Sequence, residues 1–236
     1  MPFTLVSVEG NIGSGKSVVM DALKQRFQHN PRVLFLEEPV NEWAQICDEH
    51  GTDILTKFYN DKETYAFEFQ MVAFISRVES FKRTLALTKL EPNHHFVLIT
   101  ERTIYTDCLV FAQMLRDLNK MTYMQHCIYL KWFKACSEDM PLHKIVYIKT
   151  NPTICEQRIH TRLRPGESAI ELPYLTQCES YHTHLMDTIH TLLNNIHPET
   201  LVLNGDTDMK SDDENIIETH VSHIVDFIGQ SVAYNN

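Results

Sequence analysis

The sequence lacks the excess of basic residues that a general nucleic-acid binder would need. It has 21 Lys and Arg residues against 31 Asp and Glu residues, and its formal net charge is -10. Because a phosphate backbone favours clustered Lys and Arg, this balance argues against nucleic acid as a partner. A small anionic substrate is still possible, since it needs only a local basic pocket.

Paired cysteines, an apolar run long enough to span a membrane and a basic leader are also missing. None of the six cysteines forms a C-x-x-C pair, so we expect free thiols in a reduced compartment, a cytoplasmic location and no membrane partner. The pairs His182/His184 and His220/His223 have no Cys or carboxylate partner at zinc spacing, which favours ordinary surface or half-buried histidines. The cysteines lie at positions 47, 108, 127, 136, 155 and 178.

Short apolar runs alternate with helical patterns along the whole chain. Such runs, without a period of two, are typical of parallel strands covered by helices on both faces. With no repeat, low-complexity segment or linker, we expect one α/β domain over residues 1–236. The predicted strands are 3–8, 33–36, 96–100, 145–148 and 201–203. The predicted helices are 16–28, 41–59 with an interruption at Gly51, 62–90, 104–118, 121–137, 152–162, 171–195 and 212–228.

The strongest motif follows the first predicted strand. The segment Gly10-Asn11-Ile12-Gly13-Ser14-Gly15-Lys16-Ser17 matches G-x-x-x-x-G-K-[ST], and a helical pattern opens at Lys16. Glycines let the backbone N–H groups surround phosphates, and the helix N-terminus adds positive potential. Lys16 would reach the outer phosphates of ATP, and Ser17 would bind Mg²⁺. A P-loop alone is shared by switches, motors and small-molecule kinases, so the rest of the chain must discriminate between them.

Four further segments occur in a fixed order, and with the P-loop they resemble the deoxyribonucleoside kinase family, which includes deoxycytidine, deoxyguanosine and mitochondrial thymidine kinases. The resemblance covers about residues 5–210. It implies a P-loop kinase fold with a five-stranded parallel sheet, helices on both faces, an arginine-rich lid at about 158–170 and a homodimer built on helices. The segments are Glu38-Pro39-Val40 with Trp43; Phe69-Gln70 with Ala73, Ser76 and Arg77; Glu101 to Asp107 (ERTIYTD); and Arg158, Arg162, Arg164 and Glu167 before Tyr174-Leu175.

The resemblance also implies roles for the reacting residues. Glu38 follows a strand, where acceptor chemistry is expected in a parallel sheet, and would take the proton of the attacking 5'-hydroxyl. Glu101 would help to hold Mg²⁺ together with Ser17, and Arg102 would lie near the 5'-oxygen and the transferring phosphate. Arg158, Arg162 and Arg164 would cover the ATP phosphates, where guanidinium groups stabilise the charge of the transition state. Asp208 would contact the donor base.

The acceptor pocket is expected to set the specificity. Gln70 can make two hydrogen bonds to a base edge, and the resemblance places Arg77 and Asp107 beside it as a charge pair, with Ala73 leaving space. Family members with this pair accept cytosine or purines, so we expect deoxyadenosine, deoxyguanosine and deoxycytidine, unranked, to be preferred over thymidine. The remaining pocket residues would be Trp43, Phe69 and Phe111 as flat walls, Leu55 and Phe58 beside them, and Tyr59 and Glu167 at the 3'-hydroxyl.

Three alternatives stand beside this interpretation. A thymidine-preferring deoxynucleoside kinase would share the catalytic residues. A nucleoside monophosphate kinase would share the P-loop and the arginine lid, but would need further Arg or Lys near the acceptor. A switch protein would need a guanine-reading N-K-x-D stretch, which the sequence does not contain.

The chain also departs from the family pattern at three places, and the first two leave the donor-base preference open. Thr183 follows His182 and Leu185 stands where a Trp is frequent, Met209 follows Asp208 in place of an aromatic residue, and the lid contains Pro165-Gly166 where an extra acid is frequent.

Overall fold

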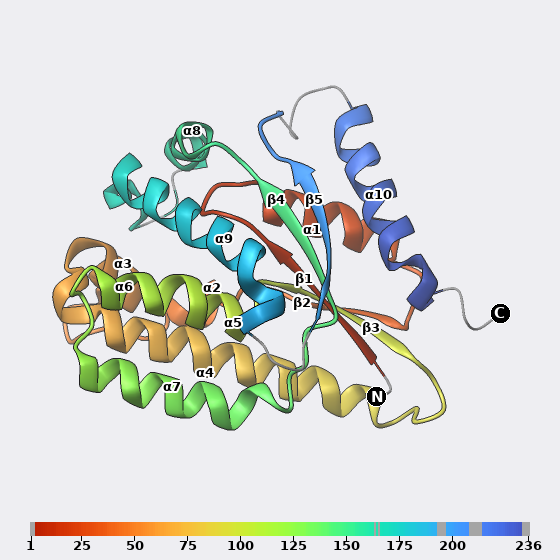
Figure 1. Cartoon of the computed structure of the whole chain (residues 1–236), viewed down its shortest axis with the longest axis horizontal. Coiled ribbons are helices and arrows are strands. Elements are labelled where there is room, and N and C mark those ends of the chain that lie inside the picture. Colours follow the sequence, from red (N-terminus) through yellow and green to blue (C-terminus); the bar gives the residue numbers. More distant parts are fainter. Residues whose placement is uncertain (1–2, 163, 165, 193–196, 208–213, 233–236) are drawn as a thin grey trace.

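The computed structural model describes residues 3–162, 164, 166–192, 197–207 and 214–232, and it contains a five-stranded sheet (Figure 1). The strand order is β2-β3-β1-β4-β5 and every neighbouring pair is parallel. The predicted α/β fold is therefore confirmed. The strands are β1 (Phe3–Glu9), β2 (Val33–Leu36), β3 (Phe96–Glu101), β4 (Lys144–Lys149) and β5 (Glu199–Asn204).

Helices cover both faces of this sheet, and successive residues of the central strands point to opposite cores. In β1, Leu5 joins a core that includes Phe74 of α4, whereas Val6 joins a core that includes Val19 of α1 and Ile224 of α10. Figure 1 shows α1 and α10 on one side and α4, α7 and α9 on the other. The long helices are α1 (Lys16–Arg26), α4 (Lys62–Thr88), α7 (Tyr123–Ser137), α8 (Pro152–Arg162), α9 (Leu172–Leu192) and α10 (Glu214–Val232).

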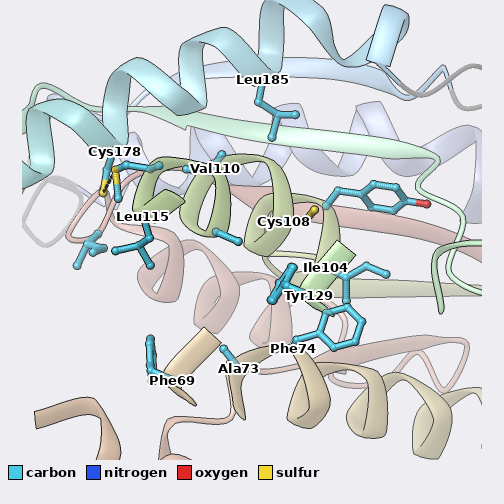
Figure 2. Packing of buried hydrophobic residues seen from close by; sticks show 14 of the residues in the cluster. Phe69, Ala73, Phe74, Ile104, Cys108, Val110, Leu115, Tyr129, Cys178 and Leu185 are labelled. Carbon is cyan, nitrogen blue, oxygen red and sulfur yellow. Dashed lines mark hydrogen bonds between the residues drawn. The ribbon is translucent and has the colours of Figure 1, made fainter. Parts of the chain in front are cut away.

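The larger core fixes α4, whose N-terminal half carries much of the predicted acceptor pocket. Phe74 packs edge-on against Tyr129 of α7, with ring centroids 5.5 Å apart, and both rings are fully buried (Figure 2). Truncating such a buried aromatic side chain typically costs about 3–5 kcal/mol. Phe69 lies on the same helix five residues before Phe74, and Ala73 directly precedes Phe74, so this packing also sets the positions of Phe69 and Ala73.

The predicted helix across 41–59 is wrong between residues 44 and 53. Helix α2 (Val40–Trp43) ends early and α3 (Ile54–Asn60) starts only after a turn. Asp48 accepts hydrogen bonds from the backbone N–H groups of His50 and Thr52, and Gly51 has φ +80°. Asp53 then caps α3 by accepting from Thr56 N at 2.9 Å. Aspartate side chains that satisfy turn and cap donors compete with a continuous helix.

The predicted helix at 104–118 is interrupted in its hydrogen bonding. Between α5 (Ile104–Thr106) and α6 (Gln113–Asp117), residues Asp107–Ala112 form a π-helical turn. Such turns insert one extra residue and occur frequently at functional sites. Other boundaries differ by up to four residues, and 193–195 and 212–213 of two predicted helices lie outside the described residues.

Two further findings concern the described chain as a whole. None of its helices combines the length and the apolar character required to cross a membrane. The six cysteines are all free thiols, three of them buried, one partly buried and two exposed.

Candidate active site

A cavity of about 670 Å³ lies beyond the carboxyl ends of β1, β2 and β3. It brings together the predicted acceptor pocket and most of the predicted phosphate cradle. Of the predicted residues, Gly10, Asn11 and Ser14 do not line it, and Asp208 lies outside the described residues. The predicted residues that line it are Ile12, Gly13, Gly15, Lys16, Ser17, Glu38, Trp43, Leu55, Phe58, Tyr59, Phe69, Gln70, Ala73, Arg77, Glu101, Arg102, Asp107, Phe111, Arg158, Arg162, Arg164 and Glu167.

The predicted phosphate cradle is a loop that requires glycine at its turns. A Cβ atom on Gly13, whose φ is +79°, would lie 2.6 Å from the carbonyl oxygen of Cys155 on α8. Gly15 has φ +102° and precedes the first residue of α1. The buried Asn11 side chain braces the loop by donating to Leu175 O at 2.8 Å and accepting from Ile12 N. The loop is therefore held in place at the N-terminus of α1, where an anion is favoured.

Lys16 projects into the end of the cavity that the P-loop residues line, which is called the phosphate end below. The Lys16 residue is 5% exposed there. Its Nζ donates to Asn11 O at 2.8 Å and lies 3.9 Å from Glu101 Oε1. Burial and the neighbouring charge of Arg102 lower the pKa of Lys16 to about 8, although Glu101 and Glu38 oppose this shift. A buried ammonium with few anionic partners is well placed to gain from the charges of a bound phosphate group.

Ser17 and Glu101 form the part of the site that could hold a metal ion. Ser17 Oγ donates to Glu101 Oε2 at 3.2 Å, so both oxygens stand together beside the phosphate loop. Mg²⁺ prefers oxygen ligands and usually takes only one or two from the protein, the others coming from phosphates and water. The pair fits that pattern, and the described residues contain no cluster of three or more His, Cys, Asp or Glu side chains that could hold a metal.

Glu38 and Arg102 face each other between the phosphate end and the acceptor end. Glu38 Oε1 lies 3.5 Å from Arg102 Nε. Burial acts to raise the pKa of Glu38, but the positive charges of Arg102, Lys16 and Arg77 outweigh it, so the pKa lies below its ordinary value. Burial and repulsion from Glu38 instead raise the pKa of Glu101. Glu38 is therefore ionised at neutral pH.

Arg102 has an unusual backbone as well as a crowded side chain. Its φ of +64° lies in the left-handed region, which costs a non-glycine residue on the order of 1–3 kcal/mol. The turn is held because Arg102 N donates to Val8 O at 3.1 Å and Thr100 Oγ1 donates to Arg102 O at 2.9 Å. The guanidinium lies over the ring of Phe111, 4.9 Å from its centroid. The strained turn thus aims the side chain into the cavity instead of along the strand.

Arg77 and Asp107 form a bidentate pair at the acceptor end. Arg77 Nε donates to Asp107 Oδ2 at 2.7 Å and Nη2 donates to Oδ1 at 3.3 Å, and both side chains are 4% exposed. Arg77 Nη1 also donates to Glu101 O at 2.6 Å. Burial raises the pKa of Asp107, and the Arg77 charge opposes that rise. Since each oxygen of Asp107 can accept more than one hydrogen bond, the carboxylate can still receive a donor from a base.

Aromatic rings enclose the rest of the acceptor end. Phe58 and Phe69 are stacked with centroids 4.7 Å apart, and Trp43 meets Phe69 edge-on at 5.3 Å. Trp43 Nε1 donates to Ser76 Oγ at 2.9 Å, which fixes the indole plane. Lys62 lies over the ring of Tyr174, 5.0 Å from its centroid. Flat, rigid walls of this kind suit a planar aromatic ligand.

The lid residues are joined to Glu167. Arg162 donates twice to Glu167 Oε2 and once to Oε1, at 2.6 to 3.0 Å, and Arg164 donates to Oε1 at 3.3 Å. The residue expected at the 3'-hydroxyl is therefore bound to two arginines expected at the ATP phosphates. Arg158 instead donates to the carbonyl oxygens of Ser14 and Thr207. Pro165 of the lid lies outside the described residues.

Three residues in or beside this region, Tyr174, Asp206 and Glu9, were given no role from the sequence. Tyr174 and Asp206 line the cavity, and Asp206 accepts from Asn151 N at 2.7 Å. Glu9, directly before the P-loop, is buried and accepts from Ser7 and from Thr103, while its Oε2 has no partner among the described residues. Burial raises the pKa of Glu9, and Arg102 opposes this. A carboxylate placed directly between the predicted strand 3–8 and the P-loop is the sequence signal for Glu9.

Comparison with known proteins agrees with this geometry. A family model described as deoxynucleoside kinase matches residues 6–228. The chain is similar to a fowlpox virus protein named "Probable deoxycytidine kinase", with 30% identity over 95% of this chain and 88% of the relative. It is 28% identical to human deoxycytidine kinase over 90% and 88% of the two chains. It is also 28% identical to the mitochondrial deoxyguanosine kinase of Xenopus laevis over 75% and 71%.

The family match extends from β1 to α10 and thus covers every strand of the sheet. It confirms the resemblance inferred from the P-loop and the four later segments. Those five segments are distant in sequence, yet residues from each of them line one cavity. The chain belongs to the deoxynucleoside kinase family and is an ATP-dependent kinase.

Proposed function

We propose that this protein transfers the γ-phosphate of ATP to the 5'-hydroxyl of a deoxyribonucleoside, with deoxyadenosine, deoxyguanosine and deoxycytidine preferred over thymidine. The observation that carries the base preference is the buried Arg77–Asp107 pair at the acceptor end of the cavity. An ionised carboxylate requires hydrogen-bond donors, and the exocyclic amine of these bases is one. The names of the relatives, deoxycytidine and deoxyguanosine kinases, support the same preference.

In this proposal, Glu38 accepts the proton of the 5'-hydroxyl as that oxygen attacks the γ-phosphorus and the bond to the β-phosphate oxygen breaks. Arg102, 3.5 Å from Glu38, would orient the attacking oxygen and the transferring phosphate. Lys16 and the lid residues Arg162 and Arg164 would stabilise the charge that develops on the phosphate oxygens. Because catalysis of this reaction is mostly positioning and charge stabilisation, the buried network around Arg102 matters as much as the general base Glu38.

We also propose that Ser17 and Glu101 hold Mg²⁺ together with the bound nucleotide. The ion would neutralise phosphate charge and hold the phosphates in line with the acceptor. At the other end of the acceptor, Tyr59 and Glu167 would bind the 3'-hydroxyl. Since Glu167 also binds Arg162 and Arg164, acceptor binding would be linked to the position of the lid over ATP.

The acceptor class is tested by assaying phosphate transfer from Mg-ATP to the four deoxynucleosides and to their 5'-monophosphates. We expect the nucleosides to be used with a kcat/KM about fivefold to over a hundredfold higher, since an unpaired buried polar group costs roughly 1–3 kcal/mol. At the acceptor end Arg77 is already neutralised by Asp107 and would not pair with an acceptor phosphate. If dTMP or dCMP proves the better acceptor, the protein is instead a monophosphate kinase.

The base preference is tested by removing the pair at the acceptor end. Arg77→Met alone should harm activity on every nucleoside, because it leaves a buried charge on Asp107. Arg77→Met with Asp107→Ala removes the charge and opens space for the thymine methyl group. The double variant should therefore gain on thymidine relative to deoxycytidine by about fivefold to a hundredfold, beyond the sum of the single changes. The measurement is kcat/KM for all four deoxynucleosides.

Arg83→Met is a matched control, because Arg83 lies on the same helix but is exposed and paired with Glu42. It should leave the ratio between thymidine and deoxycytidine unchanged. A wild-type preference for thymidine, or a double variant without a relative gain on thymidine, would refute the proposed role of the pair while leaving the kinase assignment intact.

We propose that two copies of the chain associate through α4 and α7. Met124, Ile128 and Trp132 recur every four residues on α7 and are 73%, 43% and 53% exposed, and Leu87 of α4 is 55% exposed. A contiguous apolar helix face of this kind is typical of a twofold interface. Met124→Glu with Trp132→Glu should shift the protein from dimer to monomer in sedimentation, whereas Val202→Glu on β5 should not. A monomeric wild type would contradict the proposal.

A further inference from the structure

A buried histidine that no step of the proposed reaction uses contacts the guanidinium of Arg102. His182 lies on α9, is 0% exposed, and its Nε2 is 3.3 Å from Arg102 Nη1. Its ring is stacked near Tyr147, at 6.3 Å between centroids, and meets Phe111 edge-on at 5.8 Å. Phe111 also carries the Arg102 guanidinium on its face. His182, Phe111 and Arg102 therefore form one packed unit at the wall of the cavity.

The hydrogen bond at the other ring nitrogen determines what Nε2 can do. Nδ1 lies 2.7 Å from the carbonyl oxygen of Cys178, which can only accept, so Nδ1 carries the ring proton. In the neutral imidazole Nε2 is then an acceptor with a lone pair. Arg102 can only donate, and the two groups match. Burial and the charge of Arg102 lower the pKa of His182 to about 3, which keeps the ring neutral at working pH.

The consequence concerns the geometry of the guanidinium. One proton of Arg102 Nη1 goes to Gly10 O at 2.8 Å, and the second faces His182. Nε faces Glu38 at 3.5 Å. With both protons of Nη1 engaged, the protons of Nη2 remain for an incoming phosphate oxygen. A guanidinium held in this way does not have to be ordered when the substrates bind.

We propose that His182 is a positioning residue for phosphate transfer, which acts by accepting a hydrogen bond from Arg102 and fixing the orientation of its guanidinium. This inference rests on the proposed function of Arg102 at the transferring phosphate. It goes beyond that function because it assigns the reaction a residue of α9, outside the predicted site. A bulky apolar contact could hold the ring of Phe111, but only an acceptor at the Nε2 position can direct an N–H of Arg102.

Two substitutions separate the acceptor from the rest of the imidazole. An asparagine side chain at position 182 reaches only as far as Nδ1, whereas a glutamine reaches the Nε2 position and offers an amide oxygen there. We expect His182→Asn to lower kcat by roughly tenfold to a hundredfold, because misplacing a reacting group by about 1 Å can cost about a hundredfold. His182→Gln should stay within about threefold of wild type. KM for Mg-ATP and for the deoxynucleoside should change by less than about threefold in both.

His184→Asn provides the matched control, since His184 is exposed two residues further along α9 and should be replaceable without loss. A double-mutant cycle then asks whether His182 acts through Arg102. In an Arg102→Lys background, His182→Asn should lower kcat by less than about twofold, since lysine cannot use the same hydrogen bond. Equal losses in the asparagine and glutamine variants, or an undiminished loss in the Arg102→Lys background, would overturn the inference.

Failure of the proposed function would differ from failure of this inference, because the wild-type protein itself would then transfer no phosphate to any deoxynucleoside. A measurement on wild-type protein covers the case in which His182→Asn does not fold. The ¹⁵N shifts of His182 should report the neutral tautomer with the proton on Nδ1 and a bare Nε2 at pH 7. A proton on Nε2 would leave no acceptor for Arg102, and the inference would be wrong.

Discussion

Lys16→Ala is expected to lower ATP-dependent phosphate transfer by about 10³-fold or more while the protein stays folded. Removing a single donor to a developing oxyanion typically costs about 10²–10³-fold, and Lys16 supplies a full buried charge instead of a neutral donor. Its Nζ makes one hydrogen bond, to Asn11 O, and lies within 3.9 Å of Glu101. Those contacts stabilise the loop only modestly, so the loss should appear in kcat and not in the folded fraction.

The measurement is steady-state transfer from Mg-ATP to deoxycytidine, with circular dichroism and thermal unfolding as checks on the fold. Lys24→Ala is the control, because Lys24 lies two turns further along α1 and pairs with Asp21 and Glu37 near the surface. It should leave transfer within about threefold of wild type. Near-normal turnover of Lys16→Ala would contradict the assignment of this loop as the phosphate site.

The parts of the site that the sequence predicted well are those in which spacing alone determines geometry. In a parallel sheet, the carboxyl ends of neighbouring strands meet at one edge. Gly10 after β1, Glu38 after β2 and Glu101 at the end of β3 therefore had to converge. The P-loop is equally local, since its glycines and the start of α1 are contiguous in the chain. The fold class followed from the same alternation of strands and helices.

Other features depend on contacts that no local pattern encodes. The left-handed backbone of Arg102 is held by Val8 and Thr100 of two different strands. The π-helical turn from Asp107 to Ala112 packs against α9 and α4, and it looks like ordinary helix in the sequence. The sequence marked His182 only as a histidine without metal partners and as the residue before a departure from the family pattern, because its partner Arg102 lies 80 residues away.

The pairing of the lid arginines with Glu167 is another feature that the sequence did not reveal. Arg162 and Arg164 were interpreted as phosphate ligands and Glu167 as a sugar ligand, on the basis of the resemblance. In the structure all three are joined, because Glu167 is 3% exposed and a buried carboxylate needs cationic partners. Sequence spacing could not reveal this pairing, because Arg162 ends α8 whereas Glu167 opens a separate helical turn, and only the fold brings the two side chains together.

Glu38→Gln is expected to lower kcat by about 10²–10⁴-fold with little change in the KM of the deoxynucleoside. Glutamine keeps the shape of the side chain and can still accept from Arg102, but it cannot take up the proton of the 5'-hydroxyl, and general-base roles typically contribute this amount. The pKa of Glu38 is lowered by Arg102, Lys16 and Arg77 against the effect of burial, so the carboxylate is already ionised at neutral pH and ready to act.

Glu37→Gln is the matched control for this prediction. Glu37 precedes Glu38 directly, but its side chain is 70% exposed and binds Lys24, so the substitution should leave kcat unchanged. The lowered pKa gives a second measurement. Glu38 becomes protonated only below its ordinary pKa. Protonation of Glu38 should therefore not lower the wild-type kcat/KM between pH 6 and pH 8. A Glu38→Gln variant that raises only KM would reassign Glu38 to substrate binding, since a base that acts in the transition state must lower kcat.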